Sequence, residues 1–246
     1  MKKQLMIFYI LLFLMSGLHS KEVITLAIGE WAPYTSSTEK NGKIAEHIVM
    51  EAFALENIEV KYKYFPWKRA RILVQRGDEL GTFPWYKTPQ RQKDFIFSKE
   101  AIMVSKTVFF HLKSLNLQWS KYEDLMEYKI GATLGFYYTT YLNNQGLEVE
   151  EVPREEMNFK KMLLRRIDMV PSDFYVGYNI IYKLFTPQKA ALFTNHPKAI
   201  LHDRMYLLLS KEISNAQKLA NKFDKGLLKL KGSGRYDEII DEFMFK

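Results

Sequence analysis

Short β-rich segments alternate with amphipathic helical segments along this chain, and that alternation limits the folds it can adopt. The segment Glu22–Ile28 is rich in β-branched residues and stops before a glycine, which is typical of a strand. A helical pattern with one apolar face follows over residues 42–53, and Val60–Tyr64 then alternates like a second strand. Pro66 begins another helical pattern that ends at Gly77. This order of strand, helix, strand and helix favours an α/β fold with a mostly parallel sheet.

The second half of the chain repeats this order. Tyr128–Ala132 and Ile167–Pro171 are short strand patterns, and Leu147–Val152 alternates like a further strand. Helical patterns lie between them, over residues 135–141 and over Glu155–Arg166. A length of 246 residues is sufficient for two α/β lobes of roughly 100 residues each. Because ligands bind in clefts between domains and at the carboxyl ends of parallel strands, we expect a ligand cleft between the lobes.

One long segment is expected to connect the two lobes. Ile102–Leu112 is apolar and β-rich, and it lies between the two repeats. The end of the chain is helical in pattern over Asn215–Lys231 and Tyr236–Phe243, and economy of connection favours packing of these helices on the first lobe. We therefore expect a first lobe made of residues 21–111 and 201–246, and a second lobe made of residues 112–200.

The first twenty residues are typical of a secretory signal peptide. Lys2 and Lys3 precede an uncharged apolar run of eleven residues, Leu5–Met15, and small and polar residues follow it up to Ser20. The run is long enough for the apolar part of a signal peptide but shorter than the roughly 20 residues of a spanning helix. We predict cleavage of residues 1–20 near Ser20 and export to the periplasm. The alternative is an uncleaved membrane anchor.

Composition excludes several classes of chemistry. The chain has no cysteine, which rules out disulfides, thiolate catalysis and iron–sulfur clusters. The net charge of +8 is spread along the chain rather than clustered, so no nucleic-acid partner is expected. Phosphate-binding glycine loops and nucleophile elbows are missing, and no two histidines have the spacing of metal ligands. Because Glu150-Glu151 and Glu155-Glu156 have the pattern of solvated faces, we predict no catalytic residue, no metal and no cofactor.

Four motifs resemble those of a known family. The segment TPQRQKDFIFS, at 88–98, resembles the T-x-x-R signature of the bacterial extracellular solute-binding proteins of family 3. WAPYT at 31–35, DLMEYKIGATLG at 124–135 and RIDMVPSD at 166–173 resemble further motifs of that family, in the same order. The resemblance implies the two-lobed periplasmic binding protein fold, with each lobe a mostly parallel sheet flanked by helices. It also implies a receptor that serves a transporter of polar amino acids.

The resemblance also implies roles for two charged residues. Arg91 matches the family arginine that binds the ligand's α-carboxylate, a role that suits the two parallel donors of a guanidinium. Asp173 matches the carboxylate of the second lobe that pairs with the α-ammonium group. The alternatives are a surface arginine in a basic loop and a helix N-cap, respectively. An arginine and an aspartate on opposite lobes would hold a zwitterion between them.

Aromatic residues mark the main departure from the family pattern. Small hydroxyl residues usually precede T-x-x-R, but this chain has FPWY at 83–86. Rings at the cleft can stack on a planar or apolar ligand or hold a cation, whereas some of them are expected to pack in the core instead. The aromatic residues expected at the cleft are Trp31, Tyr34, Trp67, Phe83, Trp85, Tyr86 and Tyr137.

The sequence therefore predicts a monomeric binding protein that is not an enzyme. It would close around a small zwitterionic or carboxylate solute and deliver it to the permease of an ABC transporter. One alternative is a periplasmic enzyme of the same superfamily, a dehydratase acting on a cyclic carboxylate, for which Glu30 is the candidate general acid. Another alternative is a module that binds a protein or another envelope component.

Overall fold

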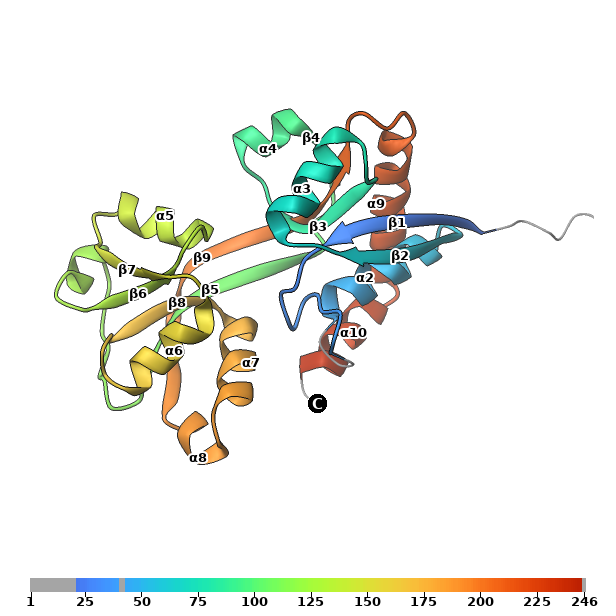
Figure 1. The fold of residues 1–246 in the computed structure, drawn as a ribbon. Helices are drawn as coiled ribbons and strands as arrows, with labels where there is room; N and C mark the ends of the chain where they lie inside the picture. Colours follow the sequence, from blue (N-terminus) through green and yellow to red (C-terminus); the bar gives the residue numbers. More distant parts are fainter. Residues whose placement is uncertain (1–20, 40–42, 245–246) are drawn as a thin grey trace, which may run out of the picture.

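The computed structural model describes residues 21–39 and 43–244 (Figure 1). The predicted signal peptide, residues 1–20, lies outside the described residues, and so does Gly42, where the first helix was expected to open. Within the described part of the chain, no helix is both long enough and apolar enough to cross a membrane.

Two lobes lie side by side, and two long strands run from one into the other (Figure 1). A single sheet passes through both lobes in the order β2-β1-β3-β9-β5-β8-β6-β7, and β4 pairs with β9 beside this path. The long strands that connect the lobes are β5 (Met103–Leu112) and β9 (Phe193–Ser210). The two-lobed α/β architecture expected from the sequence is confirmed.

The first lobe contains the two ends of the described chain. Its strands are β1 (Glu22–Ile28), β2 (Ile58–Tyr64), β3 (Gly81–Tyr86) and β4 (Phe95–Phe97). Its helices are α2 (Ile44–Ala54), α3 (Trp67–Arg76), α4 (Pro89–Asp94), α9 (Ala216–Gly232) and α10 (Arg235–Met244).

The second lobe contains the middle of the chain. Its strands are β6 (Ile130–Thr133), β7 (Val149–Val152) and β8 (Met169–Asp173). Its helices are a 3-10 turn (Tyr122–Leu125), α5 (Tyr137–Asn144), α6 (Glu155–Leu163), α7 (Phe174–Leu184) and α8 (Pro187–Ala190).

Each lobe has a parallel core, as the alternation of strands and helices predicted. In the first lobe β1 pairs in parallel with β2 over its whole length, and it also pairs in parallel with β3. In the second lobe β6 pairs in parallel with β7 and β8. Helix α3 ends at Gly77, whose φ of 81° is a left-handed conformation that glycine adopts without strain. The carboxyl ends of β1, β3, β6 and β8 therefore lead into loops and helix starts at the junction of the lobes.

The connecting strands are antiparallel to each other and to their neighbours. β5 and β9 pair from Met103↔Met205 to Leu112↔Phe193, with two register shifts between. β9 also pairs with β3 and β4 in the first lobe, whereas β5 pairs with β8 in the second. Because both strands run through both lobes, boundaries at residues 111 and 201 stay a prediction.

The C-terminal helices pack on the first lobe, as expected. α9 lies against α2, where the rings of Phe53 and Phe223 are 5.2 Å apart. Gly226 allows this close approach, because a Cβ at that position would lie 1.9 Å from the carbonyl oxygen of Ala52. Arg235 at the start of α10 pairs with Glu51 of α2. The chain therefore returns to its starting lobe after it has built the second one.

Candidate ligand-binding site

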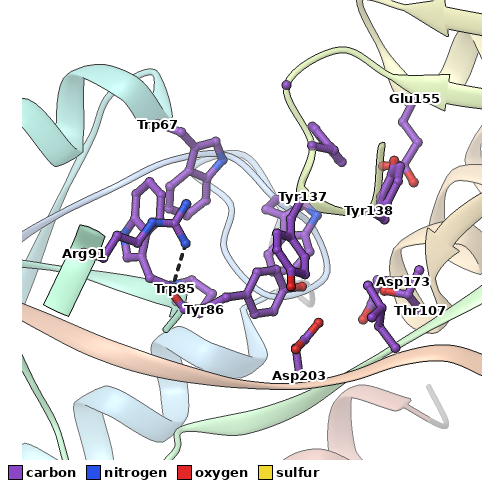
Figure 2. Close-up of a pocket in the computed structure, with 15 residues that line it drawn as sticks. Trp67, Trp85, Tyr86, Arg91, Thr107, Tyr137, Tyr138, Glu155, Asp173 and Asp203 are labelled. Carbon is purple, nitrogen blue, oxygen red and sulfur yellow. Dashed lines mark hydrogen bonds between the residues drawn. The ribbon is translucent and has the colours of Figure 1, made fainter. Parts of the chain in front are cut away.

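A cavity of about 200 Å³ lies between the two lobes (Figure 2). Residues of both lobes and of the connecting strands line it. Seven of the nine side chains expected at the cleft line this cavity: Trp31, Trp67, Trp85, Tyr86, Arg91, Tyr137 and Asp173. The structure therefore brings together residues that are up to 142 positions apart in the sequence.

Three side chains of the first lobe form one wall. The indole rings of Trp67 and Trp85 meet edge to face at 5.4 Å, and the guanidinium of Arg91 lies over the Trp85 ring at 4.7 Å. Trp67 donates its Nε1–H to the carbonyl oxygen of Glu30 at 3.1 Å. Gly29 leaves room for this ring, because a Cβ at that position would lie 2.5 Å from it. The aromatic wall is thus fixed by packing before any ligand arrives.

Helix capping explains how Arg91 reaches this wall. Thr88 is the N-cap of α4, and its Oγ1 accepts the backbone N–H of Arg91 at 3.2 Å, while Pro89 occupies the first turn. The Arg91 guanidinium donates from Nη1 to the carbonyl oxygen of Tyr86 at 2.9 Å. Among the residues that the structure describes, no carboxylate forms an ion pair with it. Burial lowers the pKa of Arg91, and nearby Arg71 lowers it further, but a guanidinium stays protonated.

The second lobe supplies an acidic wall. Figure 2 shows Glu155, Tyr138 and Asp173 on the side of the cavity away from Arg91. Asp173 is buried and caps α7, since its Oδ1 accepts the backbone N–H groups of Tyr175 and Val176 at 3.0 and 3.3 Å. The capping interpretation, which the sequence left open, is therefore correct. Asp173 also lines the cavity, and its role toward a ligand stays a prediction.

Asp173 is also a point of contact between the lobes. Tyr34 of the first lobe donates its hydroxyl to Oδ1 at 2.7 Å, and Ser105 of β5 donates to Oδ2 at 2.6 Å. Tyr86 donates in turn to Ser105 at 3.0 Å. Burial raises the pKa of Asp173, whereas these hydroxyl groups lower it. The carboxylate thus already accepts four hydrogen bonds from protein donors.

Tyr34 and Phe83 do not line the cavity, contrary to expectation. Both side chains are fully buried in the core. Phe83 packs edge to face against Tyr62 at 5.6 Å, whereas the next three residues of β3 all line the cavity. Regular alternation is interrupted here, because the pairing of β3 with β9 shifts register between Thr82 and Trp85. Tyr34 is directed at Asp173 rather than at the cavity. Core packing, the alternative for some of the aromatic residues, accounts for these two.

Glu155 corrects another expectation, that the Glu155-Glu156 pair forms a solvated face. Glu155 is 7% exposed and lines the cavity, whereas Glu156 is exposed. Burial raises the pKa of Glu155 to about 8; the Ser172 hydroxyl lowers it and Asp173 raises it further. The difference arises from the helical period: Glu155 lies on the same face of α6 as the buried Asn158, Phe159 and Met162, whereas Glu156 lies on an exposed face.

Asp203 is a cavity residue that sequence reasoning missed. It lies on β9, lines the cavity and is half-buried, and burial raises its pKa. Leu201 and Met205 share its strand face, since they are two residues away on either side. An acidic residue on an otherwise apolar strand face can indicate a cavity residue in a sequence, but β9 would first have to be recognised as a strand.

Two further contacts join the lobes around the cavity. The rings of Tyr86 and Tyr137 are 6.1 Å apart across it, and Lys183 of α7 forms an ion pair with Glu39 of the first lobe. Together with the bond between Tyr34 and Asp173, these contacts hold the two walls close to each other.

Known proteins resemble this chain in structure rather than in sequence. No protein-family model and no curated protein matches the chain. Solved structures do match, and one is a mutant of ArgBP from T. maritima, with a TM-score of 0.72 and 16% identity over 94% of this chain and 99% of that one. The chain has the fold of the two-lobed periplasmic binding proteins.

Two more solved structures support the same fold. The GluR0 ligand-binding core from Nostoc punctiforme, in complex with L-glutamate, has a TM-score of 0.72 and 17% identity over 91% of this chain and 100% of that chain. AbpA is an amino acid ABC transporter substrate-binding protein from Streptococcus pneumoniae, bound to L-arginine. It has a TM-score of 0.69 and 19% identity over 93% of this chain and 97% of that chain. All three are binding proteins or ligand-binding domains rather than enzymes.

Proposed function

We propose that this chain is a periplasmic solute-binding protein that captures a small amino-acid-like or carboxylate solute and does not transform it. The observation that carries the proposal is Arg91: its guanidinium lines the cavity between the lobes, stacks on Trp85 and has no acidic partner among the described residues. A desolvated guanidinium that keeps free donors is suited to a carboxylate, which it can bind through two parallel hydrogen bonds.

Closure of the lobes is the proposed mechanism of capture. Arg91 belongs to the first lobe and Asp173 to the second, so a solute that contacts both favours the conformation in which the lobes meet. β5 and β9 are the only segments of the described chain that run through both lobes, which makes them the proposed hinge. The bond between Tyr34 and Asp173 forms only when the lobes are close, and it adds to the closed state.

The same comparison supports the proposed partner, and the N-terminal sequence supports the proposed location. AbpA, which shares the fold, is a substrate-binding protein of an amino acid ABC transporter. We propose that this chain likewise acts as a monomer that delivers its solute to a transporter permease, after export and cleavage near Ser20. The N-terminal sequence of the exported protein tests the cleavage, since it should begin near Lys21.

A ligand screen tests the function. The mature protein is screened by thermal shift against the twenty L-amino acids, simple amines and small carboxylates, and each compound that raises the melting temperature is titrated by calorimetry. We expect micromolar or tighter binding of at least one compound, together with a smaller radius of gyration by small-angle X-ray scattering. Absence of binding by every compound would contradict the proposal, and binding without compaction would contradict the hinge.

The enzyme alternative keeps one supporting observation, but at another residue. Glu30 is exposed, accepts hydrogen bonds from Ser37 and does not line the cavity between the walls. Although burial raises the pKa of Glu30, its hydrogen bonds with Ser37 lower it to a net value below the ordinary range, which is unsuited to a general acid. Glu155, whose pKa is about 8, is the protonated carboxyl that a dehydratase would need. Turnover of prephenate by the wild type but not by Glu155→Gln would select the enzyme.

A further inference from the structure

The acidic wall contains two buried polar atoms that have no partner in the described protein. Glu155 is 7% exposed, and its Oε1 accepts no hydrogen bond. The hydroxyl of Tyr138, also 7% exposed, makes no hydrogen bond of ordinary geometry, although the Thr133 hydroxyl is close enough to lower its pKa, and both Glu155 and Tyr138 line the cavity. Leaving a buried polar group unpaired is unfavourable, because no hydrogen bond offsets the loss of its contacts with water. Two such groups beside each other at one cavity indicate that a ligand completes them.

Asp173 is less suited to a new cation than its neighbour Glu155. Its Oδ1 already accepts three hydrogen bonds and its Oδ2 accepts one, all from protein groups. A carboxylate offers about four lone-pair directions, so its capacity is largely used. Glu155 differs because one whole oxygen is unpaired. The second lobe therefore has a structural carboxylate and an available one.

The balance of charge in the cavity also favours a positively charged group at Glu155. Among the described residues that line it, Arg91 is the one basic side chain, whereas Glu155, Asp173 and Asp203 are acidic. Arg91 lies at the opposite wall from Glu155 (Figure 2), and no described cation forms an ion pair with Glu155. Trp31 and Trp67 line both this cavity and the adjoining one that Glu155 also lines. Indole rings attract cations through their faces, which adds to the preference for positive charge.

We propose that Glu155 binds a positively charged nitrogen of the solute, so that the ligand is an amine-bearing carboxylate held with its anionic end at Arg91 and its cationic end at Glu155. This inference rests on the proposed solute-binding function and specifies the class of solute. Simple carboxylates, which the function alone allows, would satisfy only the Arg91 wall. Tyr138 would complete the site by accepting a second hydrogen of the same nitrogen.

Binding through Glu155 is coupled to proton release. Burial holds the pKa of Glu155 at about 8, so it is mostly protonated at neutral pH when no cation faces it. A bound cation favours the ionised form, and the proton leaves to solvent. The titratable groups that face Glu155 or share its cavities are Glu156 and Arg154 on its own helix, Asp173 on β8, Tyr138 and Tyr137 on α5, Tyr86 on β3, Arg91 on α4, Asp203 on β9, Glu30 and Glu39 on the first lobe, and Lys183 on α7.

The test uses probes that differ only in their cationic groups. Hexanoate, 6-aminohexanoate, L-norleucine and L-lysine share a six-carbon carboxylate frame and carry no ammonium, one at either end, or two. A second pair, 3-phenylpropionate and L-phenylalanine, differs by one ammonium on an aromatic frame. Each is titrated into the wild type, Glu155→Gln and the matched control Glu156→Gln, which removes one carboxylate charge at the next, exposed position.

The expected result has two parts. The best ammonium-bearing probe binds wild type and Glu156→Gln about thirtyfold or more tightly than its ammonium-free counterpart, and Glu155→Gln loses that difference. Its affinity for the wild type also rises with pH, by up to about tenfold per unit below pH 8, whereas Glu155→Gln shows a flat profile. A merely structural Glu155 would not produce that change in profile.

Three results would overturn the inference. Equal binding of a probe with and without its ammonium group would show that the cavity does not select a cation. Unchanged selectivity in Glu155→Gln would place cation recognition at another residue, with the solute-binding function intact. Absence of binding by every probe and by every compound of the wider screen would count against the solute-binding function, and the inference would fail with it.

Discussion

The two walls of the cavity are built from different chemistry. The first lobe presents Arg91 with the rings of Trp67 and Trp85, whereas the second presents Glu155 and Asp173 with hydroxyl groups. A solute with one charge can satisfy one wall, but only a dipolar solute can satisfy both. Under the proposed function, this sorting of charge by lobe would let a dipolar solute favour the closed conformation, because it could contact both walls only when the lobes are close.

The walls also differ in how they are fixed. Arg91 is held by the capped turn of α4 and by stacking on Trp85, so it is positioned within its own lobe. Asp173 is positioned partly by the other lobe, through Tyr34. The first wall is therefore positioned by its own lobe, whereas the position of the second depends partly on contact with the first lobe. Variants of the two walls should accordingly differ in whether they affect affinity, stability or closure.

The largest effect is expected for Arg91→Ala on ligand affinity. Removing one partner of a buried charged pair costs about 2–5 kcal/mol of binding, a loss of roughly thirtyfold to several thousandfold. Because Arg91 makes no ion pair within the described protein, the melting temperature should change little. Calorimetry with the best compound of the screen measures the affinity, and the exposed Arg76→Ala is the control for loss of one positive charge. Equal affinities would refute the carboxylate role.

The second effect is on stability and belongs to Asp173. Asp173→Ala removes the cap of α7 and leaves the buried hydroxyls of Tyr34 and Ser105 without their acceptor. The free energy of unfolding should fall by about 2–4 kcal/mol. Urea denaturation of the ligand-free protein measures it. If the stability were unchanged while affinity fell, Asp173 would belong to ligand recognition rather than to the frame of the second wall.

A third effect concerns pH and Glu155. Burial raises the pKa of Glu155 from 4.5 to about 8 in the folded protein. The contribution of the protonated carboxyl to the free energy of unfolding is therefore complete below the pKa of the unfolded chain, about 4.5, and is lost as the pH rises through about 8. From pH 6 to pH 8 the ligand-free wild type should lose about 2 kcal/mol of unfolding free energy relative to Glu155→Gln. Urea denaturation at several pH values tests this difference. Parallel pH profiles for wild type and Glu155→Gln would show that Glu155 is ionised in the folded state.

The smallest effect is expected for Tyr34→Phe, which removes one contact between the walls. The variant lacks the hydroxyl that bonds Asp173 but keeps the ring packed beside Trp31. We expect a loss of about 1 kcal/mol in stability and a larger radius of gyration without ligand. Small-angle scattering of both proteins measures the second quantity. An unchanged radius would mean that this bond does not hold the lobes together.

Much of the fold follows from local patterns, and the exceptions have physical causes. β1 and α3 have the boundaries that the sequence indicates, because apolar periodicity and a terminal glycine mark them. β9 was not expected, since Pro197 and several charged residues interrupt its alternation where it passes between the lobes. α7 was also not expected as a helix, although its N-cap Asp173 was recognised as a candidate cap.

Some residues of the candidate site could likewise be predicted from the sequence, whereas others could not. Arg91 could be selected from sequence only because residues 88–91 resemble the T-x-x-R motif of a known family; the cap that Thr88 provides for α4 was found in the structure. Local sequence could not separate Trp85 from Phe83, or Glu155 from Glu156, since each pair has similar chemistry. In each case one member lines the cavity and the other lies in the core or in solvent.

The amino-acid sequence therefore determined most of the elements, with β9 and α7 as the exceptions, their order in two α/β lobes, and which residue types are available for binding. These are properties of short stretches, set by backbone propensity, periodicity and capping. Only the tertiary structure decided that Glu155 faces the cavity, that Asp173 is already occupied by Tyr34 and Ser105, and that Asp203 joins them from β9. Those facts depend on strand register and on the contact between lobes, because burial and hydrogen-bond partners arise from segments far apart in the chain.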